Sequence, residues 1–195
     1  RFSKFHYDHV LIFHANKDIR RIIPWIRTSS ISSHQYPDTL KGIQSKDIVQ
    51  IDKPTHGILR RLIMIKKIQI PPDGTHMDIV LSKDEKKEAN SFLEKHGTRS
   101  KEFIYLNIGG SVSYKQWPVD QFIALSNLIL NDTSLKIILG GGPEDTDRIN
   151  FINDQISQER VIAASNRSLI ENCALIDNAK VLVTPDSGPM HIGFS

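Results

Sequence analysis

Three loops of this sequence combine glycines with polar and charged side chains that can bind an anion. Glycine lets a backbone approach a phosphate closely, and the free N–H groups at the start of a helix attract negative charge. The combination therefore indicates a site for a phosphorylated ligand. The three loops are Asn107–Ile108–Gly109–Gly110–Ser111 followed by Lys115–Gln116–Trp117–Pro118, Gly140–Gly141–Gly142–Pro143–Glu144, and Pro185–Asp186–Ser187–Gly188–Pro189–Met190–His191.

The charged side chains of these loops suit different parts of a nucleotide. The Lys115 ammonium can neutralise a diphosphate, and the Glu144 carboxylate can accept two ribose hydroxyls, as acids in nucleotide-binding folds commonly do. Asp186 follows an apolar strand and precedes a helix start, which is a position typical of a site. The same helix start would present the amides of Ser187 and Gly188 to the ligand.

Structural roles compete with these functional ones. A lone lysine such as Lys115 is far more often solvated than bound to a ligand. Asp145 and Asp147 are better explained as first-turn acids that complement a helix dipole. His191 suits a core or capping role as well as it suits the site. Trp117 is interpreted as a packing residue.

Several other chemistries lack their sequence signatures. The sequence contains no Gly-x-Gly-x-x-Gly and no Gly-Lys-Ser/Thr, so it lacks the dinucleotide and P-loop fingerprints. Asp145–Thr146–Asp147 matches the metal-binding Asp-x-Asp only superficially. Ser187 and His191 are not flanked as a nucleophile elbow requires. The eight histidines are scattered without metal-ligand spacing.

From Lys101 onward, short apolar strands alternate with amphipathic helices. This alternation predicts a parallel, Rossmann-like sheet that is buried on both faces. The three loops follow the first, second and fourth strands, so we expect them to meet at one edge of the sheet. The predicted strands are 103–108, 135–139, 161–163 and 181–184, and the predicted helices are 118–131, 145–157 and 168–178.

The first half of the chain is less regular. Ser82 and Glu85 form a capping box that opens a helix, which Gly97 ends near His96. We place the domain boundary there, between residues 1–97 and 98–195. The elements predicted before it are a strand over 7–13, a helix over 18–27 that Pro24 interrupts, loops with short strands over 28–55, and a helix over 57–67.

Composition limits the class of protein. The 195 residues are 39% hydrophobic and 24% charged, which is ordinary for a globular protein. No segment approaches the length of a membrane span, and the first residues do not form a secretory signal. Cys173 is the one cysteine, which fits a reducing compartment. The net charge of +3 does not indicate nucleic-acid binding. The basic pairs of the first half fit a solvated helix face, or an anionic membrane or acceptor. They are Arg20–Arg21, Arg60–Arg61 and Lys66–Lys67.

In their order and spacing, the three loops resemble the motifs of the ADP-heptose:lipopolysaccharide heptosyltransferases, glycosyltransferase family 9. The last motif, Asp-Ser-Gly-x-x-His after a strand, is the most specific of the three. The resemblance is strong from about Phe103 and looser before it. Ile108 departs from the family, which often has proline there. The residues that carry the resemblance are Asn107 to Ser111, Lys115 to Pro118, Gly141 to Glu144 and Thr184 to His191.

The resemblance implies an α/β protein with the GT-B arrangement, in which two Rossmann-like domains face each other across a cleft. Residues 1–97 would be the C-terminal part of the N-terminal, acceptor-side domain, and 98–195 the donor-binding domain. The implied reaction transfers heptose from ADP-heptose to a lipid-linked lipopolysaccharide core acceptor, inverts the sugar anomer, and needs neither metal nor cofactor. The implied location is the cytoplasm, at the inner membrane surface, with no transmembrane segment.

The resemblance also assigns a donor site. Lys115 would bind the donor phosphates and Glu144 the adenosine ribose. The loop that begins at Asp186 would hold the diphosphate and heptose, with His191 supporting it, and the first loop would line the phosphate path. The implied donor-binding residues are Gly109, Gly110, Ser111, Lys115, Glu144, Asp186, Ser187, Gly188 and His191.

The family's base is a carboxylate in a Gly-Asp loop that this sequence does not match. We therefore expect the base upstream of Arg1, the sequence to be incomplete at both ends, and these 195 residues alone to lack turnover. Asp186 is the catalytic candidate within the chain. Two alternatives stay open, which are a GT-B transferase that uses another sugar nucleotide and a non-catalytic nucleotide-binding fragment.

Overall fold

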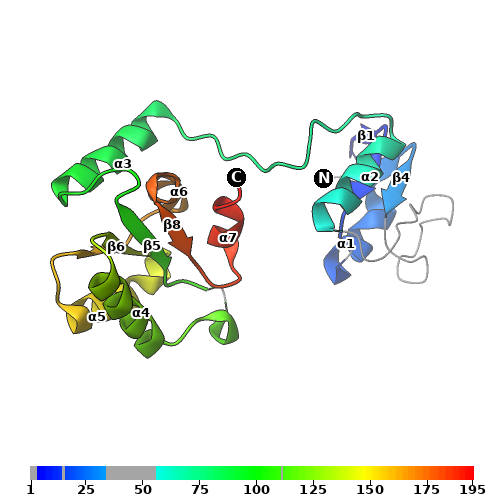
Figure 1. The fold of residues 1–195 in the computed structure, drawn as a ribbon. Helices are drawn as coiled ribbons and strands as arrows, with labels where there is room; N and C mark the ends of the chain where they lie inside the picture. Colours follow the sequence, from blue (N-terminus) through cyan, green and yellow to red (C-terminus); the bar gives the residue numbers. More distant parts are fainter. Residues whose placement is uncertain (1–3, 15, 34–55, 111) are drawn as a thin grey trace. The chain divides into compact units, whose positions relative to one another are not determined.

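The computed structural model describes residues 4–14, 16–33, 56–110 and 112–195, and the chain forms two compact units, Arg1–Thr75 and His76–Ser195 (Figure 1). The sequence placed the domain boundary near residue 97 instead. The helix α3 (Lys83–Lys95) lies in the second unit because its buried Ala89 and Leu93 share a core cluster with α6 (Leu169–Asn178). The acceptor-side and donor-side identities of the units stay predictions.

The second unit contains a four-stranded sheet in which every pairing is parallel. Its strand order is β7-β6-β5-β8, so the chain moves from β5 outward to β7 and then returns to the other side of β5. This arrangement confirms the parallel, Rossmann-like sheet that the sequence predicted. The strands are β5 (Phe103–Asn107), β6 (Lys136–Gly140), β7 (Val161–Ala164) and β8 (Val181–Val183).

Helices cover both faces of this sheet, as the ribbon shows (Figure 1). On one face, α4 (Val119–Asp132) and α5 (Thr146–Ile156) bury Phe122 and Ile149 against β5 and β6. On the other face, α3 and α6 pack around Phe103 and Ile138, and Ile192 of α7 (Gly188–Ile192) packs against the same cluster. Because apolar contacts occupy both faces, every residue of β5 is buried.

Local sequence signals set the ends of these helices. Ser82 and Glu85 form the predicted capping box at the start of α3, and Ser168 and Glu171 form a second capping box at the start of α6. Gly97, just after α3, has a φ of 60°, which glycine adopts without strain. The observed helices agree with the predicted ones to within a residue or two at their ends.

The first unit contains two short pairs of parallel strands. β1 (His6–Tyr7) pairs with β3 (Arg27–Thr28), and β2 (Val10–Ile12) pairs with β4 (Ile31–Ser33). Ile12 of β2 and Ile23 form a small core, against which Val10 and Ile31 pack.

The described helices of the first unit are short. Asn16 caps α1 (Lys17–Ile22), and the 3-10 turn η2 (Ile23–Trp25) contains Pro24, where the sequence placed the interruption. α2 (Gly57–Lys67) has its predicted bounds. The strand predicted over 7–13 is divided between β1 and β2. Of the loops with short strands predicted over 28–55, β4 is one such short strand, and residues 34–55 lie outside the described residues. Among the described residues, no helix is long and apolar enough to span a membrane.

Replacing Ile138 with Ala should destabilise the second unit by about 2–5 kcal/mol, because it leaves a cavity at a side chain of 0% exposure under α6. The matched control is Leu128→Ala on α4, where 59% of the side chain is exposed and the cost should be about 0.5 kcal/mol or less. Urea denaturation followed by circular dichroism measures both. Equal costs would contradict the buried position of Ile138 in the core.

Candidate functional site

The site residues lie where the strand order of the sheet reverses, between β5 and β8. β5 has β6 on one side and β8 on the other, and α4 and α6 cover opposite faces. Asn107 at the end of β5 is level with Gly140 of β6, and Leu106 is level with Val183 of β8. The loops after these three strands therefore start side by side. Open parallel sheets bind ligands at this kind of switch point, beyond the carboxyl ends of the strands.

The side chain of Asn107 ties the β5 loop to the β8 loop. It is only 2% exposed, and its Nδ2 donates to the Gly109 carbonyl at 2.9 Å. The same nitrogen lies 3.2 Å from Thr184 Oγ1 and 3.3 Å from Ser187 Oγ, both of which follow β8. A buried amide that satisfies its donors in this way fixes the two loops relative to each other.

Lys115 and Asp186 form an ion pair across the same two loops. Lys115 Nζ donates to Asp186 Oδ2 at 2.8 Å, and the two side chains remain solvent-accessible. This contact lowers the pKa of Asp186 through its hydrogen bond and charge, and it raises the pKa of Lys115 for the same reasons. Asp186 is therefore a carboxylate and Lys115 an ammonium at neutral pH. The sheet edge holds a cation that an anionic ligand can reach.

Two side chains brace the loop that carries Lys115. Gln116 Nε2 donates to the Gly110 carbonyl at 3.0 Å. Arg148 of α5 donates to the carbonyls of Ile108 and Trp117, at 3.2 and 3.1 Å, one near each end of the loop. The lysine therefore extends from a loop whose backbone is held at several points.

Asp145 joins the β5 loop to the glycine loop after β6. Its side chain is 4% exposed, and its Oδ2 accepts from the Gly142 N–H at 2.9 Å. A Cβ on Gly109 would lie 2.2 Å from the same oxygen, and one on Gly141 would lie 2.8 Å from it, so both glycines leave room for the carboxylate. Burial is the main cause that raises the pKa of Asp145. Asp145 is thus a buried contact between two loops, and not only the first-turn acid that the sequence predicted. Glu144 beside it is exposed.

The remaining predicted residues of the β8 loop surround the start of α7. Ser187 is the residue before the helix, and its Oγ lies 3.2 Å from Thr184 Oγ1. Gly188 has open space where a side chain would be. His191 is exposed in the last turn of α7, which excludes the core alternative, whereas the capping and site roles stay predictions.

Two further expectations concern the β5 loop. Trp117 packs edge-on against Phe122, with ring centroids 4.9 Å apart, which confirms its role in packing. Ser111 lies outside the described residues, so its predicted place on the phosphate path stays a prediction. Among the described residues, no group of three or more His, Cys, Asp or Glu side chains is arranged to hold a metal ion.

The sequence indicated some of the supporting residues and missed others. Asn107 was part of a motif without a role of its own, although a polar residue that ends an apolar strand is a usable signal. Arg148 occurs on an amphipathic helix among other charged residues, and nothing local marks its contacts. Tyr105 and Asn172 lie within strand and helix patterns that predict only burial. Tyr105 is hydrogen-bonded to Asn172, and Asn172 is hydrogen-bonded to the glycine loop after β6.

The likeness to known proteins agrees with this geometry. The family model for glycosyltransferase family 9 (heptosyltransferase) matches residues 35–195. A curated relative, lipopolysaccharide heptosyltransferase 1 of Campylobacter coli, is 28% identical over 138 residues, which cover 68% of this chain and 40% of the relative.

Solved structures share the fold. The family 9 glycosyl transferase of Veillonella parvula superposes with a TM-score of 0.73 at 23% identity, over 95% of this chain and 53% of that one. The E. coli heptosyltransferase WaaC with ADP superposes with a TM-score of 0.69 at 18% identity, over 98% of this chain and 60% of that one. The same enzyme with ADP-2-deoxy-2-fluoro heptose superposes with a TM-score of 0.64 at 18% identity, over 98% of this chain and 59% of that one. The chain thus spans 40% of the curated relative and 53% to 60% of these solved chains.

Replacing Lys115 with Met should raise the pKa of Asp186 toward its usual value, because the hydrogen bond and the charge that lower it are both removed. In the unaltered chain the ion pair persists as the pH falls, and it is lost when the pH passes below the lowered pKa of Asp186. Carboxyl carbon NMR titration measures this pKa.

Lys136→Met is the matched control, since Lys136 Nζ donates to the His96 carbonyl near the amino end of β6 and not at the site. Added salt should reduce the difference between the unaltered chain and the Lys115 variant, because the pair is exposed. An Asp186 pKa that is the same with and without Lys115 would contradict the ion pair.

Proposed function

Because the chain belongs to glycosyltransferase family 9, the heptosyltransferases, we propose that it transfers a heptose from ADP-heptose to a lipopolysaccharide core acceptor. The name of the Campylobacter coli relative supports this acceptor class. The E. coli structures with ADP and with a fluorinated ADP-heptose support this donor. In this proposal, the second unit is the donor-binding domain.

The observation that carries the proposal is the ion pair between Lys115 and Asp186 at the switch point of the sheet. A diphosphate bound there would meet the Lys115 ammonium and take the place of the Asp186 carboxylate beside it. Asp186, once released, would accept hydroxyls of the heptose. The Asn107 contacts support this assignment, because they keep both loops in place while the pair opens.

Glu144 is the proposed ligand of the adenosine ribose. It is exposed in the loop after β6, next to the β5 loop, and the buried Asp145 links these two loops. A carboxylate there can accept hydrogen bonds from both ribose hydroxyls while the diphosphate extends toward Lys115. Gly109, Gly110 and the Ser187–Gly188 turn line the remaining phosphate path in this proposal.

The proposed reaction is a direct displacement at the anomeric carbon. An acceptor hydroxyl oxygen forms a bond to that carbon, the bond from the carbon to the β-phosphate oxygen breaks, a base takes the hydroxyl proton, and ADP leaves. Attack opposite the leaving diphosphate inverts the anomer. Lys115 stabilises the charge that develops on the diphosphate, so the proposal includes no metal ion.

Asp186 is poorly suited to be the base. In the proposed donor complex its carboxylate accepts hydrogen bonds from the heptose hydroxyls, so it is not placed to take the proton of the acceptor hydroxyl. We therefore assign it to donor binding and assign proton removal to a group outside these loops.

The acceptor in this proposal is lipid-linked, which places the reaction at the cytoplasmic surface of the inner membrane. Arg60 and Arg61 are exposed on α2 of the first unit, and their charge suits anionic lipids or a phosphorylated acceptor. This location rests on charge and on the relative's name.

Calorimetric titration with ADP, ADP-heptose and UDP-sugars tests the proposal. We expect ADP and ADP-heptose to bind, and ADP-heptose to bind more tightly than any UDP-sugar. Preference for another sugar nucleotide would indicate a transferase with a different donor. Binding of ADP with no gain from the heptose would favour a nucleotide-binding module, and no binding of either would contradict the donor site.

Substitutions at the ion pair should have opposite effects on ADP. Lys115→Ala should weaken ADP binding by about tenfold, because the cation that meets the diphosphate is lost. Asp186→Asn should strengthen ADP binding by about threefold, because it frees Lys115 and removes a like charge, yet it should weaken the preference for ADP-heptose over ADP. Calorimetry measures each affinity.

Lys136→Ala is the matched control for both variants and should leave ADP affinity unchanged, because Lys136 lies at the amino end of β6. If Lys115→Ala bound ADP as the unaltered chain does, the proposed role of Lys115 would be wrong.

A further inference from the structure

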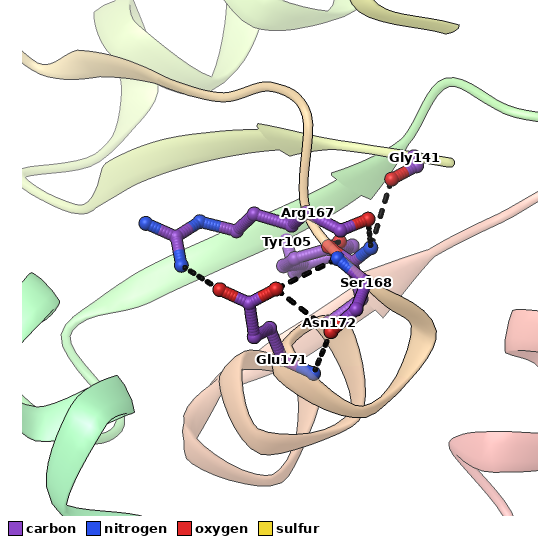
Figure 2. A network of polar contacts seen from close by, with 6 residues as sticks. All are labelled: Tyr105, Gly141, Arg167, Ser168, Glu171 and Asn172. Atoms are coloured by element: carbon purple, nitrogen blue, oxygen red, sulfur yellow. Dashed lines mark hydrogen bonds and ion pairs between the residues drawn. The ribbon is translucent and has the colours of Figure 1, made fainter. Parts of the chain in front are cut away.

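A buried pair of polar side chains lies behind the glycine loop, on the face of the sheet that α6 covers. Tyr105 of β5 has 0% of its side chain exposed, and Asn172 in the first turns of α6 has 6%. Tyr105 Oη donates to Asn172 Oδ1 at 2.6 Å (Figure 2). Buried polar groups are costly unless their hydrogen bonds are satisfied, so this pair needs an explanation.

The chemistry of the two groups fixes the direction of every bond. Burial raises the pKa of the Tyr105 hydroxyl, so the group stays protonated and donates. The amide oxygen of Asn172 must then be the acceptor, which turns its nitrogen away from Tyr105. Asn172 Nδ2 donates to the Gly141 carbonyl at 2.8 Å and approaches the Arg167 carbonyl at 3.4 Å. One amide thereby links the loop after β6 to the loop before α6 (Figure 2).

The peptide group between Gly141 and Gly142 is held at both ends. Its carbonyl accepts from Asn172 Nδ2, and its N–H donates to Asp145 Oδ2 at 2.9 Å. A peptide is planar, so two contacts on opposite sides fix its orientation. Gly140, one residue earlier, packs directly against Tyr105, because a Cβ there would overlap the Tyr105 hydroxyl.

The start of α6 is itself held in place. Ser168 and Glu171 form its capping box, and Glu171 Oε1 accepts from Arg167 Nη1 at 3.1 Å (Figure 2). The Arg167 guanidinium lies 4.1 Å from the centroid of the Phe92 ring of α3. Asn172 therefore extends toward the glycine loop from a helix end that cannot easily move.

The held peptide is two residues before Glu144, and the Glu144 carboxylate folds over Gly142, where a Cβ would lie 2.5 Å from each of its oxygens. We infer that Tyr105 and Asn172 are positioning residues for nucleoside recognition, because they fix the Gly141–Gly142 peptide and so set where Glu144 meets the ribose hydroxyls. This inference rests on the proposed function. The ligand feature that it concerns is the pair of ribose hydroxyls, and not the diphosphate.

The test is the ratio of the affinities for ADP and for 2′,3′-dideoxy-ADP, measured by calorimetry on the full chain. Tyr105→Phe removes only the hydroxyl, and Asn172→Asp keeps the acceptor oxygen but removes the donor to Gly141. Each should lower the ratio by about three- to tenfold, as should Glu144→Gln, because the ribose contact is misplaced or lost. The double variant Tyr105→Phe/Glu144→Gln should be no worse than Glu144→Gln alone.

Two control variants separate positioning from general effects. Phe103→Leu changes a buried side chain two residues before Tyr105 on the same face of β5, so it should lower the melting temperature and leave the ratio unchanged. Lys115→Ala should weaken the binding of ADP and of dideoxy-ADP by the same factor, because both ligands contain the diphosphate.

The outcomes distinguish this inference from the proposed function. If the unaltered chain bound ADP no better than dideoxy-ADP, the ribose role of Glu144 would fail and the inference with it, although the diphosphate site would stand. If Glu144→Gln lowered the ratio while folded Tyr105→Phe and Asn172→Asp did not, the inference alone would be overturned. A failure of the unaltered chain to bind ADP at all would overturn both.

Discussion

Helices that cover both faces of a parallel sheet leave only the strand ends for polar chemistry. In the second unit, α4 and α5 bury one face and α3 and α6 bury the other, so the middle of β5 offers no surface to a ligand. The carboxyl ends of β5, β6 and β8 lie at the same level, and their loops must share one edge. This constraint explains where the residues of the candidate site lie, because each of them is in those loops or directly beneath them.

Two kinds of contact hold the edge together, and they differ in burial. The contacts of Asn107, Asp145 and Asn172 are buried, and breaking one would leave a polar group without a partner in a dry environment. The pair of Lys115 and Asp186 is solvent-accessible and can open at little cost, since water and salt screen the two charges. The site thus combines a fixed backbone with a charged pair that is open to solvent.

The buried contacts also explain why the loops contain glycine. Gly109 and Gly141 leave space for the Asp145 carboxylate, and Gly140 leaves space for the Tyr105 hydroxyl. In these positions the absence of a side chain serves the packing of the protein's own polar groups. Gly188, by contrast, has open space around it, which is compatible with the approach of a ligand to the β8 loop.

The sequence by itself determined the elements and the edge. The apolar strands, the capping boxes at Ser82 and Ser168, and the turns after the strands are local signals, because hydrophobic period and side-chain capping act over a few residues. They were enough to predict a parallel sheet with Lys115, Glu144 and Asp186 in loops at one edge, and the structure confirms the sheet and shows that the three loops start side by side. The ion pair of Lys115 with Asp186 was not predicted. The boundary of the units was not a local property, because it depends on which core the apolar face of α3 joins.

Only the tertiary structure decided which side chains touch. Because the strand order puts β8 beside β5, Asp186 lies next to Lys115, which is 71 positions earlier in the chain. The contact of Tyr105 with Asn172 spans 67 positions, and neither residue differs locally from an ordinary core residue. Such contacts depend on loop closure and on the packing of distant elements, whereas a local pattern records only the burial and the period of its own segment.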